Sequence, residues 1–246
     1  MTSVWRVADV VAAHMETPTA RTLRLRIPGL KGHLAGQHVD VRLTAPDGYQ
    51  AVRSYSIASA LPADELELTV EELADGEVSP YLVHGVAVGD QLEVRGPVGG
   101  WFVWRPGDDM PVQLIAGGSG VVPLMSMARA HAAAGSPAPF RLLYSVRSPR
   151  SVYYADELGR LEADTTSPFH VTYVYTREAP PGWERPAGRL SPELLKASTP
   201  PPADSPRFYL CGATAFVEAV SDWLVDAGHD AALIRTERYG GTGGTP

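Results

Sequence analysis

Residues 111–135, PVQLIAGGSGVVPLMSMARAHAAAG, decide the fold of the second half of the chain. An apolar run at 111–117 meets a glycine-rich turn at 117–120, and helix-forming residues follow at 121–135. This order predicts a buried strand that leads through a tight turn into a helix. Glycines there let the backbone approach a pyrophosphate, and the helix start supplies unpaired N–H groups and a positive dipole end.

The turn GGSG at 117–120 has a second interpretation. It is not the full G-x-G-x-x-G fingerprint, and no acidic residue follows at the usual spacing. A tight turn between a strand and a helix explains it equally well, so the motif alone does not establish dinucleotide binding.

Strands and helices alternate downstream of this turn. Apolar or alternating runs predict strands at 140–146, 169–176, 207–212 and 230–239, and helices are predicted at 152–161, 191–197 and 214–228. This rhythm predicts a doubly wound α/β domain, with a parallel sheet covered on both faces. The linker RPGDDMP at 105–111 precedes it, and we place this domain at 108–246.

The part of the chain before the linker is rich in short β-forming runs. Strands are predicted at 22–27, 38–43, 51–57, 65–73 and 91–96, with one short helix at 79–85. Glycine and proline separate these runs, as is typical of antiparallel strands joined by tight turns. The pattern predicts a closed antiparallel β-barrel, which we place at 1–107.

Composition excludes several classes of protein. The 246 residues carry a net charge of −7, which argues against general nucleic-acid binding. A single cysteine, Cys211, excludes an internal disulfide and a four-cysteine zinc or iron–sulfur site, so no metal site is predicted. No signal peptide and no apolar run long enough to span a membrane is present, and we expect a cytoplasmic protein without a membrane partner.

Four further motifs carry possible chemistry, and each also has a plain structural interpretation. The runs are RSYS at 53–56, DGEVSPYL at 75–82, YLCGAT at 209–214 and TERYGGTGG at 236–244. Arg53 suits a phosphate, but without further context an exposed strand residue is the favoured interpretation. Ser79 and Pro80 suit a helix start, where Ser79 is the expected N-cap. A lone cysteine such as Cys211 is more often a small buried apolar residue than a reactive group.

Taken in chain order, these motifs resemble the ferredoxin–NADP reductase-like flavoproteins, and the resemblance covers nearly the whole chain. The matching segments are the flavin motif Arg53-Ser54-Tyr55-Ser56, the flavin-phosphate segment Gly76 to Ser79, the dinucleotide turn GGSGVVP at 117–123 and the segment Tyr209-Leu210-Cys211-Gly212. Each is modest alone, but their order across the expected domain boundary is specific.

The resemblance implies a flavin site in the barrel. Arg53 and the segment with Gly76, Val78 and Ser79 would hold the flavin pyrophosphate. Tyr55 would pack against the isoalloxazine, Ser56 would hydrogen-bond its N5, and the backbone of Ile57 and Ala58 would meet its pyrimidine edge. We expect FAD rather than FMN, because the helix start suits a pyrophosphate and Trp101 and Phe102 could accommodate an adenine.

The resemblance also implies a nicotinamide site in the α/β domain. The dinucleotide turn comprises Gly117, Gly118, Ser119, Gly120, Val121 and Pro123. Cys211, followed by Gly212, would lie beside the nicotinamide carbon that gives up hydride. Glu237 and Tyr239 match an acid-x-aromatic ending in which the aromatic ring covers the flavin. Two departures are visible: Ala-Thr-Ala replaces the usual proline after Gly212, and residues 240–246 follow Tyr239 where the plant-type enzymes end.

The function implied is an NAD(P)H-dependent reductase that takes hydride onto FAD N5, with Ser56, Cys211, Glu237 and Tyr239 at the reacting centre. Electrons would pass to a separate ferredoxin, a partner oxidoreductase or a small acceptor. Arg147 and Arg177, at the ends of consecutive strands, favour NADPH, although NADH remains possible. The alternatives are an electron-transfer subunit of a larger complex and a non-catalytic flavin-binding sensor.

Overall fold

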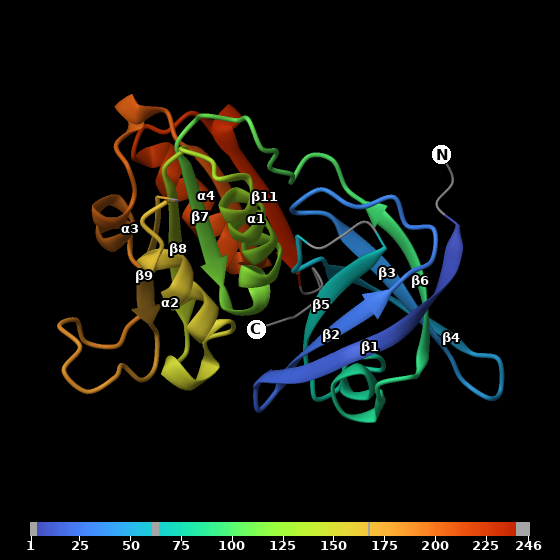
Figure 1. Cartoon of the computed structure of the whole chain (residues 1–246). Helices are drawn as coiled ribbons and strands as arrows, with labels where there is room; N and C mark the ends of the chain where they lie inside the picture. Colours follow the sequence, from blue (N-terminus) through green and yellow to red (C-terminus); the bar gives the residue numbers. More distant parts are fainter. Residues whose placement is uncertain (1–3, 61–63, 167, 240–246) are drawn as a thin grey trace. The chain divides into compact units, whose positions relative to one another are not determined.

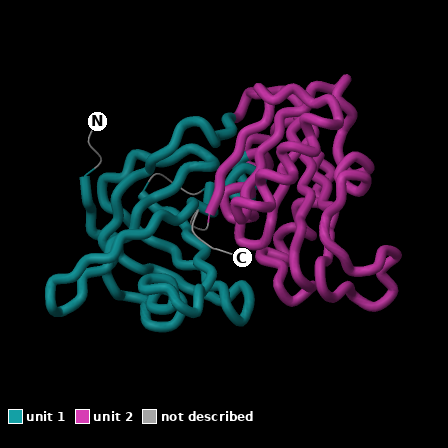
Figure 2. The backbone as a smooth tube through the Cα atoms, turned by 180° about the vertical axis from the view of Figure 1, so that it is seen from behind, with its two compact units in different colours: residues 1–105, 125–130 teal, residues 106–124, 131–246 magenta. Residues whose placement is uncertain are grey.

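The computed structural model describes residues 4–60, 64–166 and 168–239 and contains two compact units (Figures 1 and 2). The first unit comprises residues 1–105 with 125–130, and the second comprises 106–124 with 131–246. The chain thus passes from one unit to the other once inside the predicted linker and twice inside the helix at Val121–Ala134. The domain limits 1–107 and 108–246 stay predictions.

The first unit is built on a six-stranded sheet in which every pairing is antiparallel. Its strands are β1 (Trp5–Thr17), β2 (Ala20–Arg26), β3 (His38–Thr44), β4 (Gln50–Ser56), β5 (Glu65–Glu71) and β6 (Gln91–Val98). They are ordered β4-β3-β6-β1-β2-β5, and a bridge between Ile57 and Leu68 joins the two ends of that order. The predicted antiparallel barrel is confirmed.

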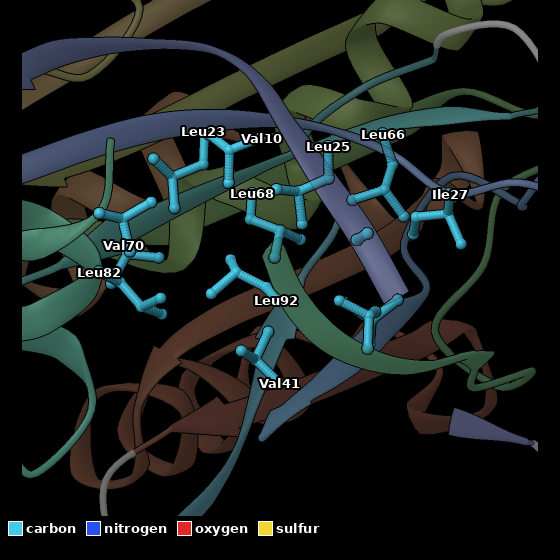
Figure 3. Close-up of a cluster of buried hydrophobic side chains, with 14 of the residues drawn as sticks. Val10, Leu23, Leu25, Ile27, Val41, Leu66, Leu68, Val70, Leu82 and Leu92 are labelled. Atoms are coloured by element: carbon cyan, nitrogen blue, oxygen red, sulfur yellow. The ribbon is translucent and has the colours of Figure 1, made fainter. Parts of the chain in front are cut away.

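Apolar side chains that alternate along these strands fill the interior of the barrel. Leu23 and Leu25 on β2 and Leu66 and Leu68 on β5 are fully buried, and Figure 3 shows them converging with residues from β1, β3 and β6. Burying such side chains stabilises the fold by about 1.5–3 kcal/mol each. The period-two pattern therefore sets which face of each strand points inward.

The long strand β1 was not predicted, although it lies in the middle of the sheet between β6 and β2. Its register against β2 shifts between Val10 and Ala12 and again between Met15 and Thr17. Each bulge inserts a residue and breaks the period-two alternation on which strand prediction relies. These two bulges explain why the sequence pattern does not predict β1.

The helix expected at 79–85 is present as η1 (Tyr81–Gly85), but its N-cap position is held by Pro80. Ser79 does not cap it, because the Ser79 Oγ accepts a hydrogen bond from the backbone N–H of Leu73 at 3.0 Å. The hydroxyl instead closes the preceding turn.

The second unit contains a five-stranded sheet in which every pairing is parallel. Its strands are β7 (Val112–Gly117), β8 (Phe140–Val146), β9 (Phe169–Tyr175), β10 (Arg207–Ala213) and β11 (Ile234–Tyr239). The helices are α1 (Val121–Ala134), α2 (Ala155–Ala163), α3 (Pro192–Ser198) and α4 (Thr214–Asp226), with short turns η2 (Gly118–Gly120), η3 (Pro149–Ser151), η4 (Pro202–Asp204) and η5 (Ala231–Leu233). The predicted α/β architecture is confirmed.

The strand order β11-β10-β7-β8-β9 places the chain's first parallel strand, β7, in the centre of the sheet. From β7 the chain winds outward through β8 and β9 and then returns to the other side through β10 and β11. The carboxyl end of β7 is therefore a topological switch point, where open α/β sheets bind ligands. On one face, α3 and α4 bury Leu195, Val217 and Val220 against the sheet.

Among the described residues, no helix is both long enough and apolar enough to cross a membrane.

Candidate functional site

The glycine turn lies where the strand order predicts a ligand crevice, at the carboxyl end of β7. Gly118 has a φ of +55°, a conformation that favours glycine, and η2 leads directly into α1. The backbone thus turns sharply and presents the start of a helix at the switch point. Val121 and Pro123, which complete the predicted turn, are buried, whereas Ser119 is half-buried.

Gly120 and Cys211 pack directly against each other. A Cβ built on Gly120 would lie 2.1 Å from the Cys211 carbonyl oxygen, so no larger residue fits. Gly117 and Gly212 both face the ring of Phe216, at 2.8 Å from the Cβ position that each lacks. The structure therefore brings the predicted turn and the Tyr209–Gly212 segment together within the second unit.

Cys211 is buried in this cluster, and Glu237 stands opposite it in the parallel register of β10 and β11. Burial, reinforced by the Glu237 carboxylate, raises the pKa of the Cys211 thiol well above its usual value. The side chain is therefore a neutral thiol at physiological pH and is unsuited to act as a nucleophile. Its position suits packing beside a bound ring.

Tyr239 also belongs to this cluster. Its Oη donates a hydrogen bond of 2.6 Å to the Gly117 carbonyl oxygen, and the side chain is about two-fifths exposed. The ring therefore lies against the dinucleotide turn of its own unit. Its predicted role as a cover for the flavin stays a prediction, and residues 240–246 lie outside the described residues.

Arg147 and Arg177 adjoin each other at the ends of β8 and β9. The Arg177 backbone N–H donates to the Arg147 carbonyl oxygen at 3.0 Å, and both side chains are exposed. Within the described part of the chain, neither guanidinium forms an ion pair or a side-chain hydrogen bond. Two exposed arginines whose backbones adjoin at neighbouring strand ends suit a phosphate, whose oxygens match the planar fork of a guanidinium.

In the first unit, Arg53 is engaged by a carboxylate that the sequence analysis did not single out. Its Nη2 contacts Glu77 Oε2 at 2.7 Å, and Tyr49 Oη donates to Glu77 Oε1 at 3.1 Å. Arg53 and Glu77 are each about half exposed. The structure therefore brings Arg53 to the Gly76–Ser79 segment, as the predicted flavin-phosphate site requires.

Tyr55 and Ser56 follow on the same strand. Burial raises the pKa of Tyr55 to about 12, with a smaller opposing effect from Arg53, so the phenol stays neutral. Its ring packs partly against the barrel core. Ser54, on the other face of β4, donates from Oγ to Asp40 Oδ1 at 2.7 Å, which anchors the strand.

The backbone at Ile57 and Ala58 is already hydrogen-bonded within the barrel. Ile57 N–H donates to Gln37 O at 2.9 Å, and Ala58 N–H donates to Glu67 O at 2.8 Å. Arg129, which the sequence analysis missed, donates from Nη1 to the Ala58 carbonyl oxygen at 2.9 Å. The contact of these two residues with a flavin edge stays a prediction, and it must use carbonyl groups or rearrange these bonds.

The remaining flavin-site residues differ in accessibility. Gly76 is packed so that a Cβ would lie 2.7 Å from Ser79 Oγ, and Val78 is buried. Trp101 is 63% exposed, whereas Phe102 is only 6% exposed. Of the two expected adenine contacts, Trp101 is therefore the exposed one and Phe102 the buried one.

Each unit, taken by itself, has residues that fit one of the two cofactors: the second unit fits a nicotinamide dinucleotide, and the first fits a flavin. The second unit has a glycine turn without room for a Cβ at a helix start, and the first has an exposed guanidinium beside a half-buried aromatic ring. Backbone N–H groups and guanidinium groups donate hydrogen bonds to phosphate oxygens, and an aromatic ring can stack on a planar heterocycle.

Comparisons with known proteins match both units. The oxidoreductase FAD-binding domain matches residues 8–103, and the oxidoreductase NAD-binding domain matches residues 114–222. The glycine betaine monooxygenase reductase subunit of Chromohalobacter salexigens is 31% identical, over 84% of this chain and 56% of its own length. A ferredoxin–NAD(P)(+) reductase component of naphthalene 1,2-dioxygenase/salicylate 5-hydroxylase systems from Ralstonia sp. is 32% identical, over 86% and 62%.

This chain thus spans between about half and two thirds of the length of these curated relatives. Among solved structures, a ferredoxin NADP+ reductase from Neisseria gonorrhoeae, with bound FAD and NADP, is similar at a TM-score of 0.79 and 25% identity. The similarity covers 95% of this chain and 98% of that one. The chain belongs to the ferredoxin reductase-like family of FAD- and NAD(P)-dependent oxidoreductases.

Proposed function

We propose that this chain oxidises NADPH and passes the electrons through FAD to a separate acceptor. The observation that carries the proposal is the glycine turn at the switch point of the parallel sheet, where Gly120 has no room for a Cβ against Cys211. A backbone this close-packed at a helix start suits a pyrophosphate. The two matched domain families support the same assignment.

The barrel residues would bind and orient the flavin. Arg53 would form charge-assisted hydrogen bonds to its pyrophosphate, and Tyr55 would pack against the isoalloxazine. Ser56, at the end of β4, would hydrogen-bond to N5. These contacts fix the ring relative to the rigid barrel, which is what reaction at one ring position requires.

The residues of the second unit would bind and orient the nicotinamide dinucleotide. The turn at 117–120 would hold the pyrophosphate, and the neutral Cys211 thiol would pack beside the nicotinamide ring. When bound, the two cofactors supply the redox chemistry, a hydride that leaves nicotinamide C4 for flavin N5. Glu237 and Tyr239 would position the ring, and none of these side chains needs to react covalently.

Flavin binding is tested by Arg53→Ala. Loss of a charge-assisted contact to a phosphate costs about 1.5–3 kcal/mol, which is roughly a 10- to 150-fold loss of FAD affinity. Fluorescence titration of flavin-free protein with FAD measures this directly. A variant that binds FAD as tightly as the parent protein would show that Arg53 is only a surface residue.

The proposed preference for NADPH rests on Arg147 and Arg177, whose backbones adjoin at the ends of β8 and β9 and whose side chains form no ion pair among the described residues. The extra 2′-phosphate of NADPH needs such cations. We expect kcat/KM to favour NADPH, and Arg147→Ala and Arg177→Ala to reduce that preference mainly through KM. A parent protein that prefers NADH, or variants that lose both cofactors equally, would contradict this assignment.

The acceptor would be a separate redox protein or a small molecule. The two relatives above are described as reductase components of oxygenase systems, which supports a protein acceptor such as a ferredoxin or a partner oxygenase. In that case the chain works as the electron-transfer subunit of a larger system. Fast reduction by NADPH with slow turnover on small acceptors would support this form of the proposal.

A further inference from the structure

An anionic side chain occupies the segment that is expected to receive an anion. Glu77 lies between Gly76 and Ser79, the segment proposed to hold the flavin pyrophosphate, and its carboxylate contacts Arg53 Nη2 at 2.7 Å. The guanidinium also donates from Nη1 to the Val52 carbonyl oxygen at 2.9 Å. Both ends of the Arg53 guanidinium are therefore engaged by the protein itself.

Tyr49 holds the carboxylate in this position. Its Oη donates to Glu77 Oε1 at 3.1 Å, while Glu77 Oε2 faces Arg53. Tyr49 and Glu77 also line a cavity of about 550 Å³, together with Ala51 and Tyr81. Glu77 thus borders this cavity and also contacts Arg53, the arginine proposed to bind phosphate.

A carboxylate and a pyrophosphate cannot both share one guanidinium without cost. Both anions accept hydrogen bonds from the same N–H groups of Arg53, and like charges at contact distance repel each other. An ion pair between half-exposed side chains is weak, so a pyrophosphate can displace Glu77. Breaking the contact between Glu77 and Arg53 nevertheless costs free energy, and this cost lowers the affinity of the site for the pyrophosphate.

We propose that Glu77 is a built-in competitor of the FAD pyrophosphate for Arg53, and that it sets FAD affinity below what the site would otherwise reach. The inference rests on the proposed role of Arg53 in flavin binding. The contact with Glu77 neutralises Arg53 and holds it at the site. When FAD binds, the carboxylate must leave the guanidinium, so flavin binding and release are coupled to this exchange.

The test is a fluorescence titration of flavin-free protein with FAD, and separately with riboflavin, which lacks the phosphates. The variants are Glu77→Gln, Arg53→Ala and their combination, and Asp75→Asn is the matched control. Asp75 is an exposed acid two residues from Glu77 without an ion pair among the described residues. Circular dichroism checks that each variant is folded.

We expect Glu77→Gln to bind FAD about 2- to 5-fold more tightly than the parent protein. Asp75→Asn should match the parent, riboflavin affinity should not change, and the gain should vanish in the Arg53→Ala background. Unchanged or weaker FAD binding by Glu77→Gln, with FAD still lost in Arg53→Ala, would overturn the inference and leave the proposed function standing. An equal gain in the Arg53→Ala background would also overturn it, and full FAD affinity in Arg53→Ala would overturn both.

Discussion

Gly120 is limited by space and not by backbone conformation. Its φ of −60° suits any residue, but a Cβ would lie 2.1 Å from the Cys211 carbonyl oxygen. Gly120→Ala must therefore push β10 away from the dinucleotide turn. We expect a loss of about 1–3 kcal/mol in the free energy of unfolding, as for other overpacked sites, together with weaker NADPH binding.

Gly159→Ala is the matched control for this prediction. Gly159 lies in α2, and nothing stands within 4 Å of its Cβ position. Alanine there should stabilise the protein by about 0.5–1 kcal/mol, because glycine is unfavourable inside a helix. Urea unfolding and NADPH titration of both variants check the pair. A Gly120→Ala protein as stable and as tightly binding as the parent would refute the close-packing argument.

At the scale of single residues, the sequence predicts which side chains belong to the candidate site but not which other residues they contact. The order of the motifs singled out Arg53, Cys211 and the glycine turn. The contacts of Arg53 with Glu77 and of Tyr239 with Gly117 join residues far apart in the chain. Such pairs depend on how loops and strand ends meet in space, and no local pattern encodes them.

At the scale of elements, His131 anchors the end of α1 to the strand that follows. It is buried, its Nε2 lies 2.8 Å from the Ala138 carbonyl oxygen, and its ring stacks on Phe140 at 4.0 Å between centroids. Burial lowers the pKa of His131, although the hydrogen bond to Ala138 partly opposes this. The folded protein therefore favours the neutral ring.

This lowered pKa predicts how stability depends on pH. Below the ordinary histidine pKa of about 6.5 the unfolded chain binds a proton that folded His131 resists, so the free energy of unfolding falls as pH decreases. In His131→Gln, which keeps an N–H donor, the decrease between about pH 7.5 and about pH 5.5 should be smaller. A pH profile of His131→Gln identical to that of the parent protein would contradict this role.

Elements with regular periodicity were predictable, and irregular ones were not. Residues 140–146 match β8 to the residue, because the strand is a short apolar run between turn residues. The expected strand at 230–239 begins only at Ile234, because Asp230 accepts from Ala232 N–H and caps the short turn η5. The strand β1 is not predicted for a related reason. Local hydrogen bonding at η5 and register shifts in β1 both override the periodicity of apolar residues from which strands are predicted.

At the scale of the whole molecule, the chain combines a barrel with a flavin-type site and a parallel sheet with a nicotinamide-type site. The switch from period-two alternation to strand–helix alternation made this architecture predictable, because each pattern fits only one kind of layer. The net charge of −7 says nothing about the acceptor, since a local surface and not the total charge recognises a partner.

The most direct test of the account is an anaerobic titration of the FAD-loaded protein with NADPH, followed through the visible absorbance of the flavin. If the two sites serve one hydride transfer, an equivalent of NADPH should bleach an equivalent of bound flavin, and NADH should do so less efficiently. A protein that takes up no FAD, or bound FAD that neither nicotinamide cofactor bleaches, would contradict the central claim.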